Sequence, residues 1–231
     1  MLARFFFVLP SAALALASPP GHKLCPSQSG MPTKPTPVLP SNGGGSELPE
    51  PSEGVSLKHI ALGFGIQNYT CADTAASPTP VGALAVLYDV THLYPGQDTL
   101  KVPLNLNEKG TGASLVKPFP KKQDLKIRSL SKKIPYLGHH YFNAAGVPTF
   151  DLDKARQLLM AKKIGDIKAP ASSPAGPEGT GAVNWLFLGD AGGSHGISYA
   201  YRVLTAGGAS HGCKAKGADS TSYTAMYWFY N

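Results

Sequence analysis

Hydrophobic residues alternate with small or polar residues over several short stretches of this chain. The plainest stretches are residues 57–66, 81–90, 136–152, 183–188, 197–203 and 222–230. In the first, Leu62, Phe64 and Ile66 recur at the period of two that is typical of a half-buried strand. The last stretch carries large residues at both odd and even positions, which predicts a strand that is buried on both sides.

Strands at these spacings predict a mainly all-β fold, an antiparallel β-sandwich or barrel of roughly six to eight strands. One stretch departs from the alternation. In Asp153–Lys163, Ala155, Leu158 and Leu159 fall on one face at helical spacing, and Asp153 could cap the N-terminus. We therefore expect one short helix there.

The beginning of the chain has the features of an export signal. Arg4 precedes an apolar run that is too short to span a bilayer, and Ala15-Leu16-Ala17 fits the small-residue cleavage rule. We expect a signal peptide at 1–17, a flexible leader rich in Pro, Ser and Gly at 18–54, and a single β-rich domain at 55–231. The mature protein is then secreted, either extracellular or bound to the cell wall, with no transmembrane segment.

The formal charge of +7 gives the chain a basic balance that favours acidic partners. The cations concentrate in a basic loop at about 101–134, where Lys117–Lys133 holds seven Lys or Arg residues and one Asp. Single-stranded nucleic-acid sites interleave aromatic residues with cations, and here only Phe119 is available, so we expect no nucleic acid partner. Anionic or cell-wall polysaccharide is the expected partner, with Trp228 and Tyr230 as exposed aromatic contacts. The alternative is that the positive charge serves solubility alone.

The segment His139-His140-Tyr141, followed a turn later by Asp151, is the most chemically suggestive part of the chain. Two strands joined at Ala145-Gly146 could bring His140 and Asp151 together as a base and its orienting carboxylate, in a secreted hydrolase. A metal could instead use His139, His140 and His195, although no HxH or HExxH spacing is present. In the structural alternative, His140 and Tyr141 are sheet residues that bond within the fold. No other cofactor is predicted.

Asn68-Tyr69-Thr70 is an acceptor sequence for N-glycosylation, and it lies at the end of the first predicted strand. We expect Asn68 to be exposed and glycosylated.

The blocks GFGIQNYTC, GALAVLYDV, GHHYF with PTFDL, NWLFL, YRVLTAGG and YTAMYWFY occur together in this order. In this the chain resembles a family of secreted proteins of unknown function, common in filamentous fungi and with shorter bacterial relatives, whose fungal members often bear the label malate dehydrogenase. The resemblance covers Val55–Asn231 and implies an extracellular β-domain.

The residues do not support the dehydrogenase label. A dinucleotide site needs G-x-G-x-x-G between a strand and a helix, and the closest stretch, Gly189–Gly193, has the wrong spacing and precedes a predicted strand. No acidic residue about 20 positions further on could hold the ribose.

The resemblance also bears on the three cysteines. Cys71 and Cys213 match the two cysteines of the blocks, which implies a disulfide between them. The rival is a bond from Cys25 to either one.

Overall fold

The computed structural model describes residues 37–95, 122–127 and 132–231. The chain divides into a unit Met1–Lys34, outside the described residues, and a unit Pro35–Asn231, to which all the elements below belong. These elements are β1 (Leu57–Cys71), β2 (Thr79–Asp89), the 3₁₀ turn η1 (Thr91–Leu93), β3 (Leu125–Ile127), β4 (Lys132–Ile134), β5 (Tyr136–Phe142), β6 (Pro148–Leu152), β7 (Gln157–Ile167), β8 (Trp185–Asp190), β9 (Tyr199–Gly207) and β10 (Gly217–Tyr230).

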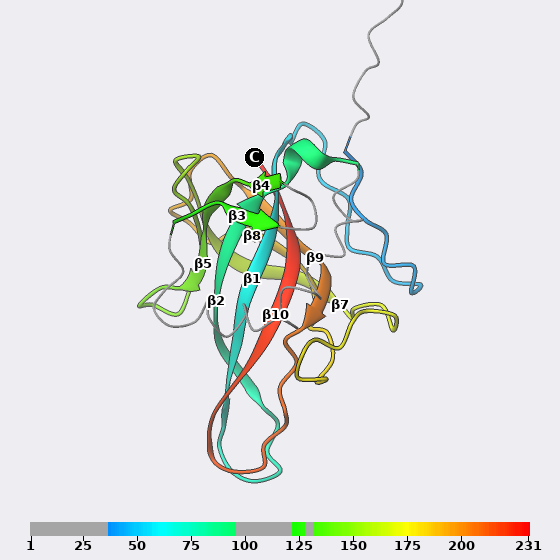
Figure 1. The fold of residues 1–231 in the computed structure, drawn as a ribbon, viewed down its shortest axis with the longest axis vertical. Helices are drawn as coiled ribbons and strands as arrows, with labels where there is room; N and C mark the ends of the chain where they lie inside the picture. The colour runs from blue at the N-terminus through cyan, green and yellow to red at the C-terminus, as the bar shows by residue number, and fades with distance from the viewer. Residues whose placement is uncertain (1–36, 96–121, 128–131) are drawn as a thin grey trace, which may run out of the picture. The chain divides into compact units, whose positions relative to one another are not determined.

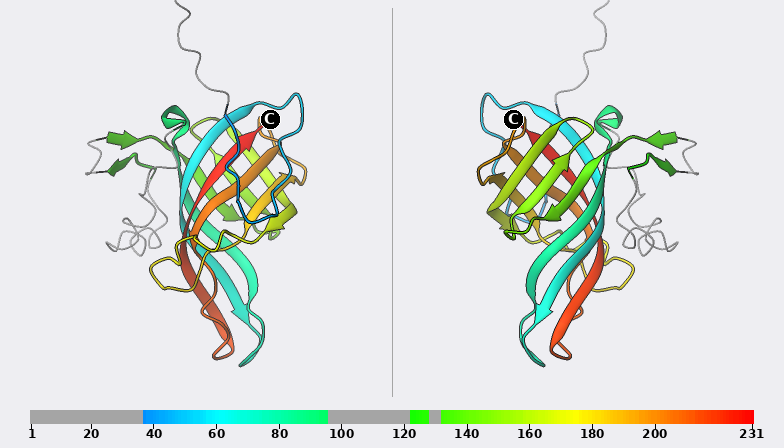
Figure 2. Two further views of the ribbon diagram at one scale, coloured as in Figure 1. Left: turned by 90° about the vertical axis from the view of Figure 1, so that its right-hand side faces the viewer. Right: turned by 90° about the vertical axis from the view of Figure 1, so that its left-hand side faces the viewer.

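Eight strands close into an antiparallel barrel in the order β1-β10-β9-β8-β7-β6-β5-β2, and β3 and β4 form a separate two-stranded sheet (Figure 1). Figure 2 shows the strands crossing the barrel wall at a slant, as closure of a sheet requires. The predicted mainly β fold is confirmed, and of the two predicted architectures the chain adopts the barrel.

The barrel wall has apolar side chains on both faces. One buried cluster draws residues from all eight barrel strands and fills the interior, with Phe150, Tyr227 and Phe229 as its large members. The other cluster lies on the outer wall and includes Trp185 and Trp228. Strand β10 contributes alternate residues to the two clusters, which explains why its sequence is bulky at every position.

Segments outside the barrel cover the outer cluster. Leu48 is buried against it, and Leu39 and Leu125 also pack there. Leu39 and Leu48 belong to the stretch that the sequence assigns to the leader, so residues 37–54 contact the barrel. Most of the predicted basic loop lies outside the described residues, and β3 and β4 are the strands described within it.

The predicted helix at Asp153–Lys163 is wrong. Residues 153–156 form a turn, in which Arg156 has a φ of 56°, and β7 begins at Gln157. Leu159 and Ala161 then alternate into the barrel interior. Pairing with β6 and β8 on its two sides satisfies the backbone of β7, and this tertiary pairing overrides the local helical spacing.

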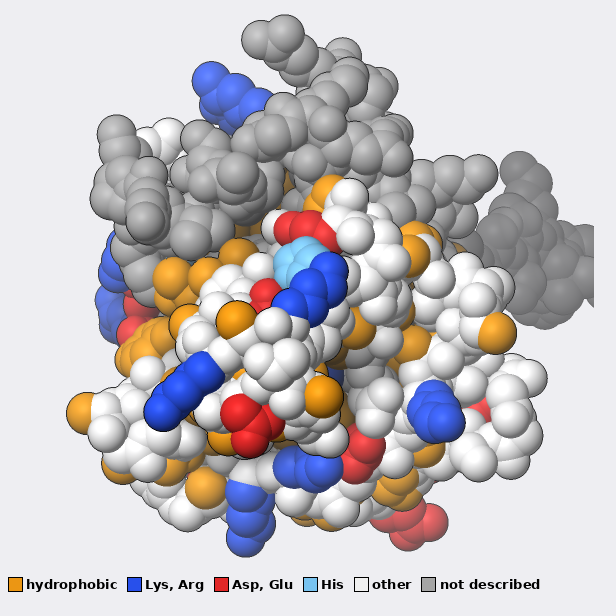
Figure 3. All heavy atoms as spheres, turned by 90° about the horizontal axis from the view of Figure 1, so that it is seen from below, with side chains coloured by type: hydrophobic (Ala, Val, Ile, Leu, Met, Phe, Trp, Pro, Cys, Tyr) orange, Lys and Arg blue, Asp and Glu red, His pale blue; other side chains and the backbone are white. Residues whose placement is uncertain are grey.

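Three strands continue past the point where their neighbours end. Strand β2 pairs with β5 only from Leu84 onward, and β9 pairs with β10 only from Tyr223 onward. The ends of β1, β2 and β10 thus form a three-stranded extension, which we call the arm (residues 66–71, 79–83 and 217–222), at the bottom of Figure 1. Seen from this end in Figure 3, basic and acidic side chains are interspersed, and neither sign forms a continuous patch.

A disulfide joins Cys71 at the tip of the arm to Cys213 in the β9–β10 connection, with Cα atoms 5.4 Å apart. This is the pair that the family resemblance implies. Nearby, the Tyr69 hydroxyl donates a 2.6 Å hydrogen bond to the Gly208 carbonyl. Among the described residues, no helix is long and apolar enough to cross a membrane.

Candidate functional site

His140 lies inside the barrel. Its ring stacks on Phe150, with centroids 4.1 Å apart, and its Nδ1 lies 3.0 Å from the Thr149 carbonyl oxygen, to which it donates. Complete burial lowers the pKa of His140 from 6.5 to about 4, and the nearby charge of Arg202 acts in the same direction, while the bond to Thr149 opposes them. At neutral pH His140 is therefore an uncharged interior residue.

Asp151 lies on the opposite side of the barrel wall. It pairs in register with His139, whereas His140 pairs with Phe150. Because side chains of successive strand residues point to opposite faces, His140 points inward and Asp151 outward. The prediction that His140 and Asp151 come together as a catalytic pair is wrong. The register of β5 and β6 differs by one residue from the register that would place Asp151 beside His140.

The predicted metal ligands are also separated. His139 and His140 occupy opposite faces, and His195 is exposed in the connection between β8 and β9. Within the described ranges, no group of three or more His, Cys, Asp or Glu side chains is arranged to hold a metal ion. The three histidines therefore do not form a metal site with one another.

His139 joins a polar cluster on the outer wall. Its Nδ1 lies 2.8 Å from the Tyr136 hydroxyl, which also bonds to Asp153, and Asp153 pairs with Lys122. Burial raises the pKa of Tyr136, and the negative charge of Asp153 raises it further. Burial would raise the pKa of Asp153, but the bonds from Lys122 and Tyr136 hold it below its usual range. The cluster ties β5 to the segment that leads into β3.

A second cluster lies at the barrel mouth where β1 begins. His59 Nδ1 is 3.0 Å from Asp89 Oδ2, and His59 Nε2 is 3.0 Å from Gln157 Oε1. Thr91 donates to Asp89 Oδ1 at 2.6 Å, and its own hydroxyl accepts from the Ile60 amide. Burial would raise the pKa of Asp89, yet the bonds from His59 and Thr91 leave it below its ordinary value.

This histidine–carboxylate pair resembles two members of a catalytic triad, in which the second ring nitrogen faces a nucleophile. Here Gln157 occupies that position, so His59 connects β1, β2 and β7 across the mouth. The sequence analysis missed His59 and Gln157. The alternation of residues along β1 could have indicated His59, because alternate residues of a strand share a face and His59 shares the inward face with Ala61 and Gly63.

The predicted aromatic contacts for carbohydrate are buried. Trp228 is 0% and Tyr230 is 5% exposed, because segments outside the barrel cover the outer wall. The prediction that they form an exposed platform is wrong. Tyr230 does, however, line a cavity.

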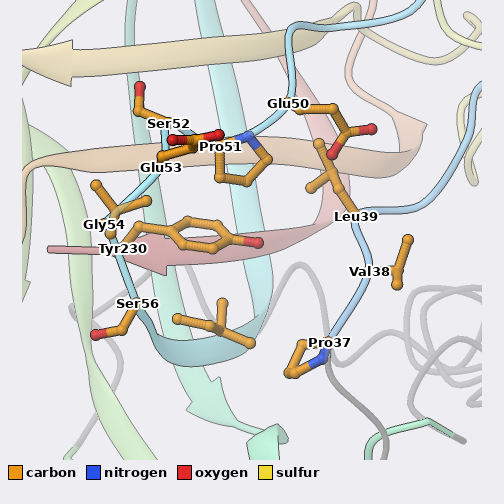
Figure 4. Close-up of a pocket in the computed structure, with 12 residues that line it drawn as sticks. Pro37, Val38, Leu39, Glu50, Pro51, Ser52, Glu53, Gly54, Ser56 and Tyr230 are labelled. Atoms are coloured by element: carbon orange, nitrogen blue, oxygen red, sulfur yellow. The ribbon is translucent and has the colours of Figure 1, made fainter.

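This cavity, the outer groove, has a volume of about 580 Å³ and lies between residues 37–57 and Tyr230 (Figure 4). Its apolar lining consists of Pro37, Val38, Leu39, Pro51, Val55 and Leu57. Among the described residues, its charged lining consists of Glu50 and Glu53 and includes no cation. Both glutamates are exposed, and neither forms an ion pair with another described residue.

Burial and the Glu50 carboxylate both act on Tyr230. Burial raises the pKa of Tyr230, and the charges of Tyr201 and Glu50 raise it further. In Figure 4 the Tyr230 ring lies across the middle of the groove, with Leu39 and Val38 on one side and Gly54 on the other. The groove thus combines an apolar surface with two carboxylates that pair with no cation of the described part of the chain. Sequence reasoning missed it because a Pro-rich stretch does not reveal what it packs against.

The burial of His140 predicts a pH-dependent stability. His140 takes up a proton below about pH 6.5 in the unfolded chain, but only below about pH 4 in the folded chain. The free energy of unfolding should therefore fall as the pH drops from about 6.5 to about 4. This difference between the two pKa values of His140 corresponds to a loss of about 3 kcal/mol in the free energy of unfolding. We expect His140→Gln to flatten this part of the curve of unfolding free energy against pH, measured by urea denaturation, and the exposed His195→Gln to leave it unchanged. Equal slopes in the His140→Gln variant and the unchanged protein would contradict a neutral, buried His140.

Comparison with known proteins identifies a family for this chain. No curated protein and no solved structure matches the chain. Residues 51–231 match a family described as "Protein of unknown function (DUF3455)", and this match begins within the segment that lines the outer groove and runs to the last strand. The chain therefore belongs to this family of unknown function.

Proposed function

We propose that this protein is an exported binding domain whose ligand is a protonated amine carried on an apolar body. The observation that carries the proposal is the outer groove, where apolar side chains surround a cavity of about 580 Å³. Of the residues that the structure describes, two carboxylates and no cation line this cavity. Export rests on the signal-like residues 1–17 and on the Cys71–Cys213 disulfide, because disulfides persist in oxidising compartments.

The chemistry of the lining selects the ligand. An ammonium group can donate hydrogen bonds to Glu50 or to Glu53 while its apolar part displaces water from Leu39, Pro51 and the Tyr230 ring. An anionic ligand would face two uncompensated negative charges. Both an alkyl or aryl amine and an amino sugar of a cell wall have this chemistry, since a sugar ring also presents an apolar face.

Calorimetric titration can test the proposal with hexylamine and with a glucosamine oligomer as the two amine probes. Hexanol and the N-acetylated oligomer serve as uncharged controls. We expect binding of at least one amine, weakened by salt, and no comparable binding of its uncharged counterpart. The amine that binds shows whether the groove takes a hydrocarbon amine or an amino sugar.

Variants locate the site. The double substitution Glu50→Gln and Glu53→Gln should weaken amine binding about tenfold, since exposed charge pairs contribute up to about 1 kcal/mol each. Asp73→Asn, an exposed acid in the β1–β2 connection, is the matched control and should bind as the unchanged protein does. Failure of both amines to bind at millimolar concentration, or equal binding by the double variant, would refute the proposal.

A further inference from the structure

We propose that Asn68 carries an N-linked glycan on the outer face of the arm, beside Gly82. The sequence Asn68-Tyr69-Thr70 meets the requirement of the modification. In the reaction, Asn68 Nδ2 bonds to the anomeric carbon of an oligosaccharide while the bond from that carbon to a lipid diphosphate breaks. The lipid diphosphate leaves, and Nδ2 gives up one proton.

The fold places Asn68 on the accessible side of the wall. Ile60, Leu62 and Phe64 belong to the outer cluster, and the alternation of β1 carries this face on to Asn68. The outer cluster does not extend to the arm, so Asn68 is only half-buried and Thr70 is exposed. Tyr69 between them points inward and bonds to the Gly208 carbonyl.

The contacts of Asn68 fix the orientation of its side-chain amide between β10 and β2. Across the pairing with β10, the Ser220 hydroxyl donates to Asn68 Oδ1 at 2.8 Å, which orients the side-chain amide. On the other side, Nδ2 faces Gly82 of β2, where a Cβ would lie 3.8 Å away. The other atom near that Cβ position is Phe142 Cγ, at 3.9 Å. Because Gly82 has no side chain, a sugar bonded to Nδ2 can lie over Gly82, beside the Phe142 ring.

A glycan at this position would not obstruct the outer groove. Leu57 lines the groove and Asn68 lies eleven residues further along the same strand, which places the two about 36 Å apart. Amine binding and glycosylation are therefore independent, and either can fail without the other.

The test uses the full chain secreted from a eukaryotic host. Intact mass is measured before and after treatment with an amidase that removes N-glycans and converts the modified asparagine to aspartate. We expect the mass to fall by one glycan and the conversion to map to Asn68. Asn68→Gln and Thr70→Ala should abolish the shift, and Thr70→Ser, which keeps the acceptor sequence, should retain it. An unchanged mass, or a shift that survives Asn68→Gln, would overturn the assignment.

A further variant tests the position of the sugar. Gly82→Val places a branched side chain where the first sugar is expected, so it should lower the melting temperature of the glycosylated protein more than that of the enzymatically deglycosylated protein. Equal losses in the two forms would show that the sugar does not lie beside Gly82.

Discussion

Replacing Gly65 with alanine is expected to destabilise the barrel by at least about 4 kcal/mol, which approaches the whole stability of many domains. A Cβ at Gly65 would lie 1.9 Å from the Leu84 carbonyl oxygen and 2.7 Å from the Ala85 Cα. Both atoms belong to the backbone of β2, which pairs with β1 at this point. A flexible side chain could move aside, but here the two strands themselves must separate. The cost should therefore exceed the 1–3 kcal/mol typical of overpacking.

Gly82→Ala is the matched control, because it adds the same methyl group to the neighbouring strand, where the nearest atoms are 3.8 and 3.9 Å away. It should change stability little. Urea denaturation of both variants, followed by circular dichroism, measures the difference. Equal stability of the Gly65→Ala and Gly82→Ala variants would mean that β1 and β2 do not approach as closely as the structure has them.

Removing the disulfide is the second large effect. The double substitution Cys71→Ser and Cys213→Ser should lower the free energy of unfolding by about 4 kcal/mol. The bond links positions 142 residues apart, and a cross-link over so long a loop removes many conformations from the unfolded chain. The same loss should follow reduction of the unchanged protein and should add nothing to the double variant.

Cys25→Ser is the control for this experiment, since Cys25 is the third cysteine of the chain and has no part in the Cys71–Cys213 bond. It should unfold at the same urea concentration as the unchanged protein. A Cys25→Ser variant as unstable as the double variant would show that Cys25 participates in the stabilising bond. A peptide map without reduction would identify its partner.

The sequence predicted those parts of the fold in which local pattern and tertiary environment agree. In β10 large residues at both odd and even positions predict burial on both faces, and the structure buries both. This pattern was a better guide than the expectation that Trp228 and Tyr230 are exposed contacts for a ligand. In Asp153–Lys163 local pattern and tertiary environment conflict. Leu158 and Leu159 suit a helix by spacing, yet the barrel needs a strand between β6 and β8.

The candidate site was less predictable because it depends on register and on packing between distant segments. A shift of one residue in the pairing of β5 with β6 decides whether Asp151 meets His140 or His139. The outer groove depends on how residues 37–57 pack against Tyr230, which no local pattern encodes. By contrast, His59 could have been found from the alternation of residues along β1, and the glycosylation of Asn68 stays a prediction that its motif alone suggests.

The pairing of β1 with β10 also constrains the order in which the chain can fold. These strands are the first and last of the barrel, and their register runs from Leu57 with Tyr230 to Cys71 with Gly217. During synthesis, β1 emerges long before its partner, and the wall stays open along one edge of β1 until the C-terminal residues follow. Contacts between such distant parts of a chain make folding slow. The barrel can therefore close only after translation of its last strand, and a chain that ends before β10 would leave an unpaired strand edge that promotes aggregation.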